Sequence, residues 1–189
     1  MKSHRPNVPG TSRRAARERA VGLLYEAYCK SISPSEVLGS LVVEPDAFAA
    51  SLVLAVEQRQ GDIDALVAGR SRGWSLDRMP VIDLILLRLG TCELLAEDQP
   101  PGVIISEAVE LAASLSTDAS AQFINGVLAS LAKELRNFDA PVGRAEPPAP
   151  PPAPPGVATS PSAYRAEHSL KQDPAEEDPG GTLGAVPGA

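Results

Sequence analysis

Residues 80–97 read PVIDLILLRLGTCELLAE, and this stretch decides the fold class of the chain. Its apolar side chains occupy most sides of a helix instead of one stripe, and a helix of that kind is normally central to its fold. Pro100, Pro101 and Gly102 follow, and residues of these types end a helix. We therefore predict a buried helix over about residues 80–97, with Leu86 in the core.

Two helix starts lie at the N-terminal side of this stretch. Apolar residues recur three or four positions apart over residues 13–30, and Thr11 or Ser12 can cap that segment. The sequence SPSE at residues 33–36 is a capping box with proline at the first helical position. It predicts a short helix over about residues 34–42.

The remaining apolar segments show the same helical spacing. They cover residues 46–60 and 62–70, separated at Gly61, then residues 103–116, and finally residues 118–135, which Thr117 or Asp118 can cap. The nearest approaches to strands, residues 41–43 and 103–105, are short and continue into helical periodicity. Six or seven helices with short connections predict a compact all-α helical bundle over residues 11–140.

The last 49 residues have a different composition. Residues 141–189 contain 12 of the 19 prolines and six of the 15 glycines. Such a segment offers few apolar side chains to offset the entropy of ordering. We therefore expect a disordered Pro/Gly-rich tail that is dispensable for folding.

Positive charge is concentrated at the N-terminus of an acidic chain. Residues 1–19 carry six basic side chains and one acidic side chain, whereas residues 20–140 carry eight basic and 17 acidic side chains. We expect residues 1–10 to be a flexible basic arm, and a polyanion could bind this end while the remainder repels non-specific contacts.

Enzyme chemistry is poorly supported by the sequence. The two histidines, His4 and His168, lie in segments where no scaffold can orient them, and the glycine patterns of phosphate-binding or dinucleotide-binding loops are absent. We expect no cofactor and no metal. Cys29 and Cys92 fit no disulfide framework or zinc spacing, so they are interpreted as small buried hydrophobes of a reduced, cytoplasmic protein.

No apolar run approaches the roughly 18 residues that a membrane span requires, and no secretory signal pattern begins the chain. We therefore expect no membrane association. Two pairs of acids, Asp62 with Asp64 and Glu107 with Glu110, are interpreted as solvated charged faces.

Arginines at the start of the first helix form a candidate RNA-binding cluster. Arg13 and Arg17 are four positions apart and share a helical face, Arg14 lies beside them, and Arg5 could reach in from the preceding arm. Guanidinium groups bind phosphate through forked hydrogen bonds and stack on the bases of single-stranded RNA. Cations in a first helical turn oppose the helix dipole unless an anion approaches. A solvated N-terminus is the alternative.

The sequence FINGVL at residues 123–128 contains conflicting signals. Asn-Gly favours a hairpin turn, yet helical periodicity continues through it. Within a helix, Gly126 costs about 1 kcal/mol relative to alanine, so a close approach should explain it. Either Phe123 and Asn125 pack inside the domain, or they present a ring and an amide to RNA.

Five motifs, in order, resemble the NusB family of transcription antitermination factors over about residues 12–138. They are RRAARERA with LLYE at residues 13–26, WSLDRMP at 74–80, the segment from Asp83 to Leu95, VIISEAVELA at 103–112, and FINGVL at 123–128.

This resemblance implies a non-enzymatic, all-helical protein of two packed subdomains. It also implies that the chain pairs with the ribosomal protein NusE, binds the single-stranded boxA element of nascent ribosomal RNA, and acts in the RNA polymerase antitermination complex. The arginine cluster then maps onto Arg13, Arg14 and Arg17, and the start of the last helix adds Gln122, where the family often has lysine, with Phe123 and Asn125. Both monomer and homodimer remain open.

A second reading is a non-catalytic protein adaptor in ribosome assembly or ribosomal RNA maturation with weak RNA binding of its own. The arginine cluster distinguishes the two, since a pure protein adaptor does not need Arg13, Arg14 and Arg17 together.

Overall fold

The computed structural model describes residues 12–71 and 73–136, and this part of the chain contains helices and no strands. The expected all-α fold is confirmed. The helices are α1 (Arg13–Lys30), α2 (Pro34–Gly39), α3 (Ala47–Gln58), α4 (Gln60–Arg70), the single 3-10 turn η1 (Leu76–Arg78), α5 (Val81–Ala96), α6 (Pro101–Leu115) and α7 (Asp118–Arg136). The predicted basic arm and Pro/Gly-rich tail, including Arg5, lie outside the described residues.

Local capping chemistry explains where the first two helices begin. The Ser12 hydroxyl accepts a hydrogen bond from the Ala15 amide, so Ser12 caps α1. Both halves of the predicted capping box form, because Ser33 Oγ accepts from the Glu36 amide and Glu36 Oε2 accepts from the Ser33 amide at 2.8 Å. Helix α2 ends at Gly39, three residues before the predicted end.

Two other boundaries differ from the sequence expectation. The break between α3 and α4 lies at Arg59, which is the C-cap of α3 and the N-cap of α4. Gly61 therefore lies inside α4. Pro101 begins α6 at its first position, where its missing N–H is not needed. The Pro-Pro pair therefore starts the next helix, whereas Glu97, in a left-handed conformation, ends α5.

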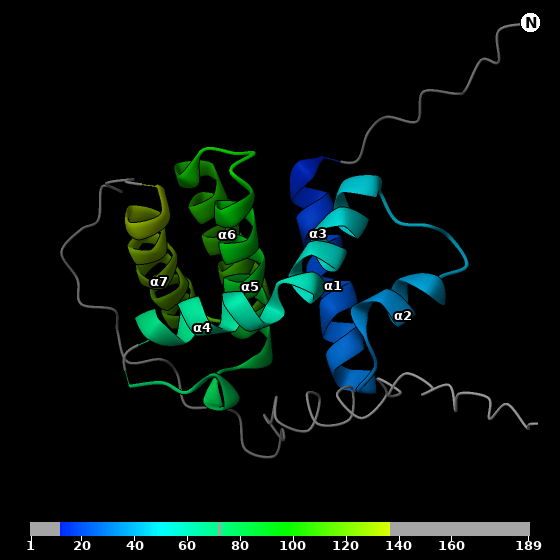
Figure 1. The fold of residues 1–189 in the computed structure, drawn as a ribbon, viewed down its shortest axis with the longest axis horizontal. Coiled ribbons are helices and arrows are strands. Elements are labelled where there is room, and N and C mark those ends of the chain that lie inside the picture. Colours follow the sequence, from blue (N-terminus) through cyan, green and yellow to red (C-terminus); the bar gives the residue numbers. More distant parts are fainter. Residues whose placement is uncertain (1–11, 72, 137–189) are drawn as a thin grey trace, which may run out of the picture.

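The helices form two packed subdomains (Figure 1). Helices α1, α2 and α3 pack on one another to form the first, and α4, α5, α6 and α7 form the second. Contacts of α1 and α3 with α5 join the two. Helix α5 therefore belongs to one subdomain and forms the wall against which the other packs.

The core is built around α5, as the apolar stretch at residues 80–97 predicts. Leu86 and Leu87 are fully buried. At Gly90, an added Cβ would lie 2.7 Å from Cδ1 of the buried Leu128 on α7. The absence of a side chain at Gly90 therefore lets α5 and α7 pack tightly.

Some interpretations of single side chains are wrong. Cys92 is buried, and burial raises the pKa of its thiol, but Cys29 is exposed on α1. Asp64 is not part of a solvated face, because its Oδ1 accepts a hydrogen bond from Arg88 Nε at 2.7 Å. No helix in the described part of the chain is long and apolar enough to cross a membrane.

Candidate nucleic-acid interface

Arg13 and Arg14 form the first turn of α1, and both side chains are exposed. This turn contains no acidic residue, so the positive end of the helix dipole and two guanidinium groups add together. The guanidinium carbon of Arg13 lies 4.9 Å from the centroid of the Phe48 ring on α3. Arg14 forms an exposed ion pair with Glu110 on α6.

Arg17 lies in a different environment from the one expected. Its exposed fraction is 2%, and its fork binds Glu93 on α5, with Nε donating to Oε2 at 2.9 Å and Nη2 donating to Oε1 at 2.8 Å. The expectation that its guanidinium faces RNA together with Arg13 and Arg14 is not met in this structure. Arg17 points toward the interior because it lies on the same face of α1 as the buried Ala20 and Leu24.

Arg17, which is buried next to the exposed Arg13 and Arg14, contacts residues of both subdomains. Nη1 of Arg17 lies 3.7 Å from Oε2 of the partly buried Glu107 on α6, an oxygen with no hydrogen-bond partner in the described part of the chain. The Arg17 guanidinium also lies 5.7 Å from the Phe48 ring centroid. This network therefore fixes the start of α1 against α3, α5 and α6.

Glu93 is a functional partner that the sequence interpretation missed. A carboxylate in the middle of a mostly apolar helix is a usable signal, since buried charges are paired. The spacing alone could not say which cation pairs with it, because Arg17 is 76 residues away.

A hollow of about 220 Å³ opens beside Arg13. Residues of α1, α3 and α5 and of the connection between α5 and α6 line it, including Phe48, Glu93, Asp98 and Gln99. It therefore lies next to the exposed arginines and combines an aromatic wall with polar groups.

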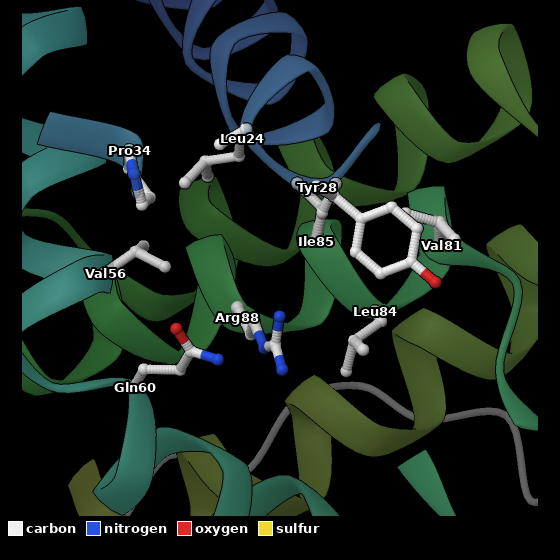
Figure 2. A pocket seen from close by; sticks show the side chains of 10 residues that line it. Leu24, Tyr28, Pro34, Val56, Gln60, Val81, Leu84, Ile85 and Arg88 are labelled. Atoms are coloured by element: carbon white, nitrogen blue, oxygen red, sulfur yellow. The ribbon is translucent and has the colours of Figure 1, made fainter. Parts of the chain in front are cut away.

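A second hollow is too small for a nucleobase. It lies between the C-terminal part of α1, the start of α2, and α3, α4 and α5, where Leu24, Tyr28 and Ile85 line it (Figure 2). Its volume of about 40 Å³ holds little more than one water molecule. Arg88 at its edge is already paired with Asp64.

The three candidate residues on α7 have different exposures. Gln122 is exposed and Asn125 is partly buried, whereas the exposed fraction of Phe123 is 3%. The ring centroid of Phe123 lies 6.3 Å from that of Trp74, with the rings tilted by 48°. Helical periodicity therefore prevails over the Asn-Gly turn signal, and Phe123 packs inside the domain instead of facing solvent.

A buried carboxylate lies near the start of α7. Asp83 on α5 is fully buried, and neither of its carboxylate oxygens has a hydrogen-bond partner among the described residues. Burial raises the pKa of this carboxyl, and the nearby hydroxyls of Ser116 and Ser120 oppose the shift. In the same region Thr117 Oγ1 accepts from the Ser120 amide and so caps α7.

Comparison with known proteins decides the family. A sequence profile described as the NusB family matches residues 14–133. This chain belongs to the NusB family. The match spans all seven α-helices, and it begins at Arg14 in the first turn of α1.

Relatives of this NusB family member carry the name transcription antitermination protein NusB. That of Kineococcus radiotolerans is 43% identical over 127 residues, which cover 65% of this chain and 93% of the relative. That of Pseudarthrobacter chlorophenolicus is 46% identical over 126 residues, covering 64% and 93%. The similarity therefore includes nearly the whole length of these relatives.

Solved structures show the same NusB fold. NusB of T. maritima has 32% sequence identity and a TM-score of 0.60, with 66% of this chain and 92% of that chain covered. A second structure, of antitermination factors NusB and NusE in complex with dsRNA, has 26% identity and a TM-score of 0.58, covering 65% and 96%.

Proposed function

We propose that this chain is a transcription antitermination factor that, together with the ribosomal protein NusE, binds boxA-type single-stranded RNA in nascent transcripts of ribosomal RNA operons and promotes processive transcription. The observation that carries the proposal is the exposed Arg13–Arg14 pair at the positive end of α1. Family membership supports it. The solved complex of NusB and NusE with dsRNA supports RNA as a ligand and NusE as a partner. The proposed role is non-enzymatic. A factor that acts on nascent transcripts acts where transcription takes place, so we expect this protein in the cytoplasm.

Within this proposal, the candidate residues divide into two groups. Arg13 and Arg14 contact phosphates, Gln122 and Asn125 offer side-chain amides, and Arg5 adds a further cation from the arm. Arg17 and Phe123 are buried, so they position the surface without touching RNA.

Glu110 competes with RNA for Arg14. The Arg14–Glu110 pair is exposed, and exposed pairs contribute only about 0–1 kcal/mol. A phosphate can therefore displace the carboxylate at little cost, because charge-assisted hydrogen bonds to phosphate replace the pair.

The test is a titration of a boxA-like single-stranded RNA at several salt concentrations, with and without NusE. Replacing Arg13 and Arg14 by alanine should weaken binding and make the slope of log affinity against log salt shallower by about 1.4, from ~0.7 per phosphate contact in single strands. Glu110→Gln should strengthen binding, since it releases Arg14.

Arg19→Ala is the matched control, because Arg19 is an exposed cation of the same helix. Arg19→Ala should change the RNA affinity and the salt slope less than Arg13→Ala or Arg14→Ala does. Equal affinity and an equal slope in wild type and in the double variant would contradict the proposal.

The adaptor reading is the second candidate, and one observation favours it. Two of the three clustered arginines, Arg14 and Arg17, are already paired with glutamates. An adaptor would bind NusE normally and show no salt-dependent RNA binding in the wild-type chain, which the same titration measures.

A further inference from the structure

The hollow beside Arg13 has the size of a pocket for one nucleobase. Its volume of about 220 Å³ corresponds to about seven water molecules at ~30 Å³ each, which is room for a single heterocycle and little more. Phe48, Leu52 and Ala55 supply aromatic and apolar wall. Unstacked bases of single-stranded RNA bind against such surfaces.

The charges around the hollow favour a base over a phosphate. Glu93 and Asp98 are the lining carboxylates, and Arg13 is the lining cation. Glu93 is already neutralised by Arg17, so a phosphate inside would face the carboxylate of Asp98. A neutral base avoids this repulsion, while its phosphate remains outside near Arg13 and Arg14.

The polar groups of the hollow are mostly hydrogen-bond acceptors. Asp98 contributes a carboxylate, and Gln99 Nε2 donates to the Asp98 carbonyl at 2.8 Å, which leaves Gln99 Oε1 as an acceptor. Exocyclic amino groups donate hydrogen bonds to such acceptors. Adenine, cytosine and guanine donate through an amino group, and uracil donates through its ring N3–H, so each of the four bases can use these acceptors.

We infer that this hollow binds one unstacked base of the RNA against Phe48, beside the guanidinium group that Arg13 holds over the ring. The inference rests on the proposed function, because it takes RNA as the ligand. The platform is already assembled in the free protein, since the guanidinium groups of Arg13 and Arg17 lie 4.9 and 5.7 Å from the Phe48 ring centroid.

An abasic scan of the RNA with the full-length chain tests this site. Each nucleotide of a boxA-like single-stranded RNA is replaced in turn by an abasic one, which removes the base and keeps the phosphate. In wild type, one position should lose about fivefold or more in affinity, as base–aromatic stacking predicts.

Substitutions of Phe48 connect that position to the hollow. Phe48→Leu keeps an apolar side chain but removes the ring, so the abasic penalty should disappear. Phe48→Tyr keeps the ring and should retain the penalty. Because Phe48 also supports Arg13, the salt slope is measured in parallel, and an unchanged slope in Phe48→Leu shows that the phosphate contact persists.

A second variant keeps the test valid if Phe48→Leu does not fold. Ala96 lines the hollow from the exposed end of α5, so Ala96→Leu adds bulk to the hollow without altering a buried residue. It too should remove the abasic penalty. A duplex of the same sequence should bind both variants as it binds wild type, since its stacked bases cannot enter.

The outcomes separate this inference from the proposed function. RNA binding with a salt slope that depends on Arg13 and Arg14, but with no abasic-sensitive position, overturns the base pocket alone. A penalty that persists in both Phe48→Leu and Ala96→Leu also overturns it. No RNA binding by wild type overturns the pocket and the proposed function together.

Discussion

The guanidinium of Arg17 shows how a side chain's surroundings change its role. A cation four residues from Arg13 on an N-terminal helix has the pattern of an RNA contact, but the fork of Arg17 is filled by Glu93 and its exposed fraction is 2%. Under the proposed function, Arg17 therefore acts only by fixing the position of the first turn of α1.

Arg17→Ala should destabilise the fold by about 3–5 kcal/mol, because removing one partner leaves the charge of Glu93 buried and unpaired. Urea denaturation monitored by circular dichroism measures the change. Arg17→Lys keeps a cation but loses the fork, so its cost should be smaller. The double variant Arg17→Ala/Glu93→Ala should cost less than the sum of the two single variants. An unchanged midpoint for Arg17→Ala would contradict the buried pair.

Asp83 predicts a pH dependence of stability. Burial raises the pKa of its carboxyl in the folded state, whereas the unfolded chain titrates near ~3.9. Between these two values the folded state retains the proton that the unfolded state releases, so this group's contribution to stability is lost as pH rises through the folded pKa.

Asp83→Asn removes that titration. The free energy of unfolding of the variant minus that of wild type should therefore increase from about pH 4 up to the raised pKa and then level off. Urea denaturation of both proteins across this range provides the measurement. A difference that is constant with pH would show that Asp83 titrates alike in both states.

At the scale of the element, α5 connects the two halves of the fold. Its residues pack against α1 and α3 on one side and against α6 and α7 on the other. An amphipathic helix could bury only one of these faces. The nearly continuous apolar sequence of α5 is the physical condition for its central position.

Leu86→Ala should cost about 2–5 kcal/mol, since it opens a cavity at a fully buried position of α5. A chemical denaturation curve gives the value. Leu54→Ala on the exposed side of α3 is the matched control and should stay within about 0.5 kcal/mol of wild type. Equal effects of the two substitutions would place α5 outside the core.

At the scale of the whole molecule, the buried apolar residues of the described part lie between Ala16 and Ala132. All of them except Ala16 and Ala49 form one continuous core that spans both subdomains. The N-terminal turn of α1, which carries the exposed arginines, therefore belongs to a helix that packs into a core formed by both subdomains.

Deleting residues 141–189 should leave the melting temperature within a few degrees of the full-length value, because the core residues precede the deletion. Differential scanning calorimetry measures this. Truncation after Ser130 is the contrasting control, since it removes the buried Leu131 and Ala132 and should unfold the domain. A fall of more than about 10 °C for the longer fragment, equivalent to several kcal/mol, would mean that the tail contributes to the core.

The sequence by itself determined the seven helical segments, the capping box at Ser33, the burial of Leu86 and the family. Helical periodicity and capping are interactions between residues three or four positions apart, so they can be read locally. Local spacing did not give the boundary at Arg59, because this one residue is the C-cap of α3 and the N-cap of α4.

Only the tertiary structure decided which arginines face solvent, which carboxylate binds Arg17, and where a hollow forms. Glu93 lies 76 residues from Arg17 and Glu110 lies 96 residues from Arg14, and Phe123 is covered by Trp74 from another segment. Helical spacing identifies the face of a side chain but not the element packed against it. Burial and ion pairing depend on that neighbour, so the division between the buried, anchoring arginine and the exposed arginines arises only when the two subdomains pack together.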